Sequence, residues 1–161
     1  MKQALILTLL ATAGITATAS PVDAHGRHHR EVTHGHVETL PGGVELGYHL
    51  HGRAKMVRTD RDGGTTEVVV RVRGLDPDTT YPAHVHDQPC SSTPAGGSHY
   101  QHVIGGPVDP VNEIWPAITT DERGRGLGVA IHDERARDDA RSIVVHFPLD
   151  TSIRLACIDL S

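Results

Sequence analysis

Short segments rich in β-branched residues, each bounded by turn-forming residues, constrain the fold of this chain more than any other feature of its sequence. The clearest is TTEVVVRVR at 65–73, which lies between two stretches of glycine, aspartate and proline at 59–64 and 74–78. Such segments are typical of β-strands. Further strand candidates span 44–58, 80–86, 113–119, 126–132, 141–147 and 152–160. Because short strands alternate with turn signals, the sequence predicts an all-β sandwich or Greek-key barrel.

Three stretches depart from this regular alternation. Residues 87–112 are rich in glycine, proline and serine and predict a long loop, while 133–140 could hold a helical turn. Pro116 interrupts the candidate strand 113–119 and predicts an edge position or a bulge, because proline has no N–H to donate to a strand ladder.

The first 24 residues have the features of a secretory signal. Lys2 precedes the apolar run ALILTLLATAGITATA, and small-x-small sequences end at Ala19 and Ala24. The run is short for a membrane span, so the pattern favours a cleaved signal over an anchor. We therefore expect a secreted, periplasmic or cell-surface protein, and no later apolar stretch is long enough to span a membrane.

Histidines concentrate after this segment, with seven of the thirteen lying in 25–51. Residues 25–43 hold few apolar side chains and include Pro41, Gly42 and Gly43, which predicts a flexible histidine-rich arm before a domain at 44–161. Two interpretations of the arm stay open. It captures copper or zinc for the domain, or it is a solvated linker.

Charge and cysteine content narrow the class of protein. A formal net charge of −5 and an aromatic content of 3% argue against a nucleic-acid-binding protein, which would present a basic face and stacking platforms. The chain has two cysteines, Cys90 and Cys157, and no CxxC motif. In an exported chain this pair favours one structural disulfide over a zinc knuckle.

Four further histidines stand in contexts that could bring them together. His84 and His86 alternate around Val85 in a candidate strand, so both face one side while Val85 faces the core. His146 ends the β-branched segment SIVVH, and His99 lies in the long loop, which the disulfide would anchor. Neutral imidazole nitrogens suit copper or zinc, so these positions are candidate metal ligands.

In order along the chain, HVH at 84–86, Cys90, AGGSHY at 95–100, VVH at 144–146 and RLAC at 154–157 resemble the copper/zinc superoxide dismutase family. The resemblance covers about 44–161. It implies an eight-stranded antiparallel Greek-key barrel and conversion of superoxide to oxygen and hydrogen peroxide. It implies the copper ligands His84, His86, His99 and His146, and an intrasubunit disulfide between Cys90 and Cys157. Arg154 matches the arginine that guides the superoxide anion, so Arg154 and His99 are the expected catalytic residues.

Two departures from the family pattern point to its copper-only branch. The loop that follows His99 contains one histidine, His102, where the family has two histidines and an aspartate for zinc. Only seven residues separate His146 from Arg154, where the zinc-bearing family has a long charged loop, so a more open site is expected. Zinc is therefore not expected, although His102, Asp109 and Glu113 could form a makeshift site with His99.

In the copper-only branch a carboxylate can orient the histidine that would otherwise bridge to zinc. Glu113 is the first candidate for this role and Asp109 the second, and the alternative for Glu113 is a solvated charge at a strand end. Trp115 is expected to pack over the place that a zinc loop would fill. His132 has no counterpart in the family and is expected to be a surface histidine.

Three functions therefore remain in view. The first is a secreted copper-dependent superoxide dismutase without zinc, the second a non-catalytic copper-binding or copper-buffering protein, and the third a structural β-domain that has lost turnover. Retention of all four ligand positions and Arg154 favours the first. The histidine-rich arm keeps the second under consideration. The sequence defines no oligomeric state.

Overall fold

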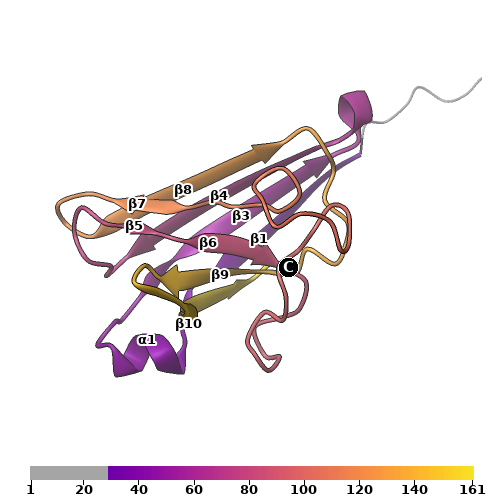
Figure 1. The fold of residues 1–161 in the computed structure, drawn as a ribbon. Helices are drawn as coiled ribbons and strands as arrows, with labels where there is room; N and C mark the ends of the chain where they lie inside the picture. The colour runs from indigo at the N-terminus through magenta and orange to yellow at the C-terminus, as the bar shows by residue number, and fades with distance from the viewer. Residues whose placement is uncertain (1–28) are drawn as a thin grey trace, which may run out of the picture.

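Two antiparallel sheets form the protein, as Figure 1 shows for a computed structural model that describes residues 29–161. The predicted signal at 1–24 and residues 25–28 of the predicted arm lie outside the described residues. The six-stranded sheet has the order β1 (Arg30–His36), β3 (His51–Thr59), β4 (Thr65–Arg73), β8 (Arg125–His132), β7 (Ile118–Thr120) and β5 (Thr80–Tyr81). The four-stranded sheet has the order β2 (Glu38–Thr39), β10 (Asp150–Asp159), β9 (Ser142–Phe147) and β6 (Ala83–His86). The all-β prediction is confirmed.

Alternation along the strands builds the core between the sheets. In β4, Val68, Val70 and Val72 are buried, whereas Arg71 and Arg73 are exposed. Successive side chains of a strand point to opposite faces, so every second valine enters the core. Val85 of β6 is fully buried, as its position between two candidate ligands predicted.

Two segments within 29–161 change sheets, which explains why this part of the chain holds ten strands rather than about eight. Pro82 separates β5, in the six-stranded sheet, from β6, in the four-stranded sheet. Val37 separates β1 from β2 in the same way. The order β4-β8-β7-β5 is that of a Greek key, in which the connection from β4 to β5 passes over the two strands between them.

The prediction of a flexible arm over 25–43 is wrong for residues 30–43, and the domain begins before residue 44. All seven residues of β1 pair with β3, and His34 and His36 face solvent. Gly35 faces inward, where a Cβ atom would lie 1.9 Å from the carbonyl oxygen of Asp159. The strand β1 needs few apolar side chains, because Gly35 lies at the close contact with residue 159 and the histidines lie on the outer face of the sheet.

Two predicted strands start later than expected. The stretch 44–58 becomes a strand only at His51, because Pro41 begins the short helix α1 (Pro41–Glu45), as proline often does at a first helical position. Gly43 lets α1 approach β10, since a Cβ atom there would lie 2.3 Å from the carbonyl oxygen of Leu155. The stretch 113–119 is a strand only from Ile118, after Pro116.

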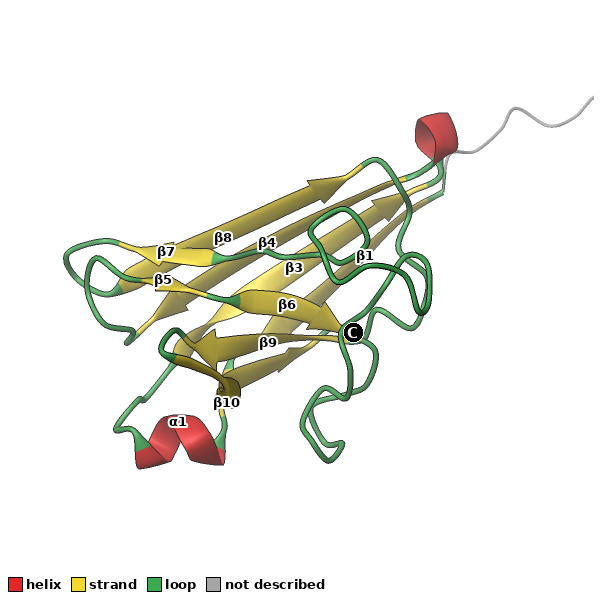
Figure 2. Cartoon of the chain, in the orientation of Figure 1, coloured by secondary structure: helices red, strands yellow, loops and turns green. Residues whose placement is uncertain are grey.

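The longest loops, which follow β6 and β8, lie to the right in Figure 2, whereas shorter turns join strands at the other end. The residues between β6 and β7 contain only turns and isolated bridges, as the predicted long loop at 87–112 requires. Residues 133–140 form no helix; they hold turns and connect the two sheets. Within 29–161, no helix has the length and apolar character needed to cross a membrane.

Candidate metal centre

The four-stranded sheet and the long loop bring the four candidate histidines to one place. Their potential ligand atoms all lie within 4.8 Å of one another: His84, His86, His99 and His146. His84 and His86 come from β6, which pairs directly with β9, the strand that carries His146. A β-bridge between His86 and His99 holds the loop histidine against the end of β6. The predicted convergence of these residues is confirmed.

The orientation of the rings fits a metal ion. Nδ1 of His84 and Nε2 of His86 and His146 are buried and lack any hydrogen-bond partner. The opposite nitrogens of His86 and His146 contact backbone carbonyl oxygens, Nδ1 of His86 with Gly97 at 3.3 Å and Nδ1 of His146 with Thr151 at 2.6 Å. When each Nδ1–H donates to its carbonyl, the unpartnered Nε2 is left deprotonated and able to bind a metal. Buried polar atoms are rarely left without a partner. These three buried nitrogens would gain one if a metal ion were bound between them.

Burial keeps three of these imidazoles neutral. The pKa of His84 is lowered to about 3, that of His86 to about 2 and that of His146 to about 4. Desolvation is the largest cause in each case, and the neighbouring His99 and, for His86 and His146, the cation of Arg154 add to it. Neutral imidazole is the form that coordinates metals, so the cluster is ready to bind one at neutral pH.

The metal-free protein should lose stability as the pH falls. The three pKa values lie below the ordinary histidine value of 6.5, so between pH 6.5 and about 4 the unfolded chain binds more protons than the folded one. The free energy of unfolding should therefore fall below pH 6.5, by about 1 kcal/mol per pH unit for each of the three histidines. Urea denaturation of metal-free protein from neutral pH to about pH 5 measures this.

Histidine variants provide the control for this pH dependence. His86→Gln should reduce the slope, whereas His36→Gln, at an exposed position on β1, should leave it unchanged. A wild-type stability that does not change over this pH range would contradict the prediction.

A buried carboxylate holds His99 from behind. Glu113 is 1% exposed, and its Oε2 lies 2.6 Å from Nδ1 of His99. The same oxygen accepts a hydrogen bond from Nε1 of Trp115 at 2.9 Å, and Oε1 accepts one from the amide of Gln101 at 3.1 Å. Glu113 is therefore not a solvated charge. Its carboxylate fixes the orientation of His99, leaving Nε2 of that ring free.

Sequence reasoning missed part of this support. Trp115 was expected only to cover the site, but its N–H also holds the carboxylate, and its ring centroid lies 5.4 Å from that of His84. Gln101 was not anticipated at all. The sequence signal that could have indicated this contact is alternation, because side chains at 113 and 115 of an extended chain point to the same side.

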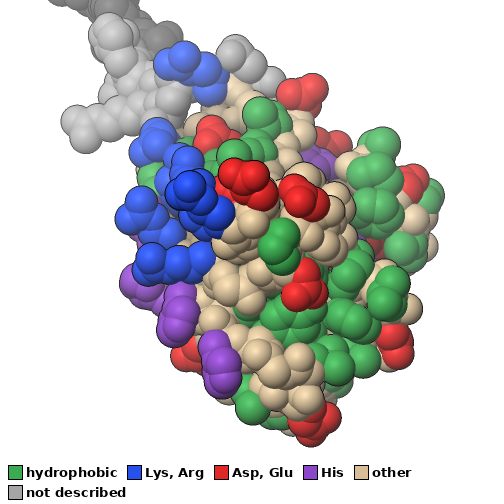
Figure 3. Space-filling model, turned by 90° about the vertical axis from the view of Figure 1, so that its left-hand side faces the viewer, with side chains coloured by type: hydrophobic (Ala, Val, Ile, Leu, Met, Phe, Trp, Pro, Cys, Tyr) green, Lys and Arg blue, Asp and Glu red, His purple; other side chains and the backbone are tan. Residues whose placement is uncertain are grey.

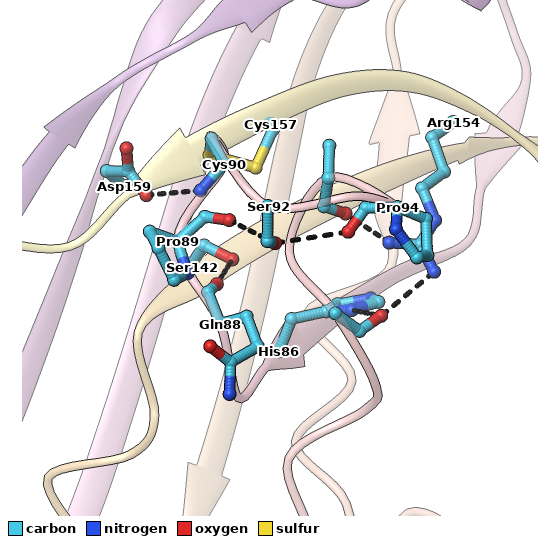
Figure 4. The surroundings of a disulfide bond; sticks show 12 residues. His86, Gln88, Pro89, Cys90, Ser92, Pro94, Ser142, Arg154, Cys157 and Asp159 are labelled. Atoms are coloured by element: carbon cyan, nitrogen blue, oxygen red, sulfur yellow. Dashed lines mark hydrogen bonds between the residues drawn. A yellow bond between two sulfur atoms is a disulfide. The ribbon is translucent and has the colours of Figure 1, made fainter.

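Arg154 and the disulfide both hold the loop that contacts His86, as Figure 4 shows. Cys90 and Cys157 form the predicted disulfide, with 5.7 Å between their Cα atoms. Arg154 lies opposite His146 in the β9–β10 ladder, and its guanidinium donates to the carbonyl oxygens of Ala95 and Gly97. Gly97 also contacts His86, so one loop carbonyl links the arginine to a candidate ligand.

The makeshift zinc set does not assemble around Glu113. Nδ1 of His102 lies 3.2 Å from a carboxylate oxygen of Glu134, which is on the connection after β8. The ring centroid of His102 is 5.1 Å from the ring centroid of His132. His132 is therefore partly buried against another histidine rather than a free surface residue. The carboxylate of Asp109 accepts hydrogen bonds from the backbone N–H groups of residues 111 and 112 and so stabilises a turn. It therefore does not support His99.

The site is open on one side. The side chain of His99 is 31% exposed, whereas His86 and His146 are buried. The connection from β9 to β10 contains only Pro148 and Leu149 between the strands, too short to cover the cluster. A small solute can therefore approach along the side of His99.

Fold and site together define a β-sandwich protein with a partly buried four-histidine centre that could hold a metal ion. Neither models of known protein families nor curated proteins match this chain. The function must therefore be argued from the centre itself.

Proposed function

We propose that this protein is a secreted copper-dependent superoxide dismutase that works without zinc. One observation carries the proposal: four imidazoles converge within 4.8 Å, backed by a buried carboxylate and bordered by the guanidinium of Arg154. An all-nitrogen set of imidazole ligands suits copper, and imidazole binds copper in both common oxidation states. The order of these residues along the chain resembles that of the copper/zinc superoxide dismutase family.

Bound copper would supply the redox chemistry, accepting one electron from a first superoxide and donating it to a second. His84, His86 and His146 would hold the ion from the rigid strands β6 and β9. His99 would complete the set from the loop. The disulfide is compatible with an oxidising compartment and so with export of the chain.

Arg154 would attract and orient the anionic substrate. Its guanidinium is partly buried, and this desolvation lowers its pKa, but arginine stays charged at neutral pH. The chain carries a net charge of −5, so the molecule as a whole repels an anion. A cation at the site would offset this repulsion and raise the rate at which the anion arrives. Two carbonyl oxygens from the disulfide-tethered loop fix the position of this cation.

Metal content and dismutation measured on the same sample test the proposal. We expect the disulfide-bonded protein, loaded with copper alone, to hold about one copper per chain and to remove superoxide rapidly. Arg154→Gln should lower kcat/KM about tenfold at low ionic strength, because anion steering typically contributes at least this much. Arg123→Gln, an exposed arginine in the turn before β8, makes the same change in charge and should have little effect.

Two results would contradict the proposal. Copper bound without turnover would favour a copper-binding or copper-buffering protein, an alternative that the exposed histidines of β1 keep under consideration. Zinc that binds together with copper and raises activity would show that the prediction of a zinc-free site is wrong.

A further inference from the structure

A groove of about 780 Å³ crosses the outer face of the six-stranded sheet, on the side opposite the core. It runs across β1, β3, β4 and β8, perpendicular to the strands. Two cross-strand rows of exposed side chains form its walls: His36, Arg53, Arg71 and Leu127 in one row, and His51, Arg73 and Arg125 in the other. The backbone of Gly52, Val72 and Gly126 forms the floor between the rows.

The walls place arginines directly opposite one another. Arg53 pairs with Arg71 across β3 and β4, and Arg73 pairs with Arg125 across β4 and β8. Like charges directly opposite in a sheet destabilise it. A fold that retains two such pairs in adjacent rows keeps an unfavourable arrangement that a bound anion would relieve.

Most of these cations lack a counter-ion. Among the described residues, Arg53, Arg71 and Arg73 have no carboxylate within 4.0 Å, and no aspartate or glutamate lines the groove. Arg125 does have a partner, because it pairs with Asp121 at 2.8 Å. Lys55, the next cation along the same face of β3, pairs with Glu67 at 3.4 Å. Three arginines without a carboxylate partner therefore lie together in the groove.

This concentration of positive charge contrasts with the chain as a whole, whose formal net charge is −5. In Figure 3 lysine and arginine side chains gather on one side of the view, with histidine side chains beside them. A general excess of basic residues does not explain such a patch. It is a local feature of the sheet face that suits an anionic ligand.

We propose that the groove binds a linear phosphate polymer, with guanidinium N–H groups donating to the phosphate oxygens. Adjacent strands lie about 4.8 Å apart and successive outward residues about 6.8 Å apart, so the groove is about 14 Å long and lined on both walls. A chain with a phosphate in every unit can contact both rows along this length. The planar forks of arginine match phosphate oxygens in pairs.

The groove selects against other polymers. No Phe, Tyr or Trp lines the groove, and its only aromatic rings are the small imidazoles of His36 and His51, so it offers little of the stacking surface that sites for single-stranded nucleic acids use. The backbone groups of its floor are already used in the sheet ladders, so an extended peptide would find few free main-chain partners there. Recognition therefore depends on regularly spaced charge alone.

Titration calorimetry with long-chain inorganic polyphosphate tests this assignment, using the disulfide-bonded protein at about 0.15 M salt. Wild-type protein should bind, and Arg71→Gln/Arg73→Gln should weaken binding at least tenfold and reduce its dependence on salt. Arg61→Gln/Arg123→Gln makes the same change in charge at exposed positions outside the groove and should bind as the wild type does. The groove variant should also unfold at the same temperature as the wild type or a higher one, since repulsion is removed.

Several outcomes would overturn the proposal. One is the absence of polyphosphate binding by the wild type at this salt concentration. Another is an equal loss in both double variants, which would reveal an effect of net charge only. A third is tighter binding of heparin, of DNA or of phosphatidylglycerol vesicles than of polyphosphate, because each would assign the groove to a different class of ligand.

Discussion

Replacing Cys90 and Cys157 together by serine is expected to lower the free energy of unfolding by about 4 kcal/mol. The two cysteines are 67 residues apart, and a crosslink across such a long loop greatly restricts the unfolded chain. The effect should also reach the metal centre. Cys90 anchors the loop whose carbonyl oxygens at Ala95 and Gly97 hold Arg154, and Gly97 also contacts His86. We therefore expect weaker copper binding as well as lower stability.

Urea denaturation and copper competition on the same samples measure the two effects. A thiol reductant should shift wild-type protein toward the behaviour of the double variant and leave the double variant unchanged. If the variant kept its full stability, the disulfide would not restrict the unfolded state as argued. If stability fell but copper affinity did not, the loop would hold its position by other contacts, such as the hydrogen bond from the backbone N–H of Cys90 to Asp159.

Glu113→Gln is expected to lower superoxide dismutation about 10- to 100-fold while the protein keeps most of its copper. Three donors surround the carboxylate of Glu113, from His99, Trp115 and Gln101. A glutamine side chain has an amide N–H₂ in place of one oxygen, so at least one buried donor would face another donor. That mismatch costs about 1–3 kcal/mol and frees the ring of His99 to rotate.

Activity, copper content and the electron paramagnetic resonance spectrum of the copper site separate a change in ligand position from simple unfolding. Glu134→Gln is the matched control, because Glu134 also contacts a histidine, His102, but outside the four-histidine centre. This control should leave the spectrum and the activity unchanged. Unaltered activity in Glu113→Gln would remove the carboxylate from the proposed mechanism.

Much of this fold could be predicted from local sequence. The segments TTEVVVRVR and SIVVHF became β4 and β9 nearly as expected, because β-branched residues bounded by turns have few alternatives to a strand. The strand 80–86 was predicted as one piece, yet Pro82 divides it between two sheets. No local pattern reveals which sheet a strand end will join, since both ends of this one alternate in the same way.

The N-terminal stretch was the largest error. Residues 30–39 were expected to be a flexible arm because they contain few apolar side chains. Their order comes from pairing with β3 and β10, which are distant in sequence, and from Gly35, which fits where a Cβ atom would meet the backbone of residue 159. A strand that is stabilised mainly by main-chain hydrogen bonds at an edge leaves little trace in composition.

In the candidate site, too, some features could be predicted from the sequence and others depend on the tertiary structure. The sequence by itself determined the residue types that could bind a metal, the placement of His84 and His86 on one face of a strand, and the only disulfide that two cysteines can form. These follow from chain periodicity and from residue chemistry. The tertiary structure decided that Glu113 rather than Asp109 supports His99, that His102 turns away toward His132, and that four arginines face one another across three strands. Such contacts depend on strand register and loop path, which arise from packing over the whole chain and not from any local stretch of it.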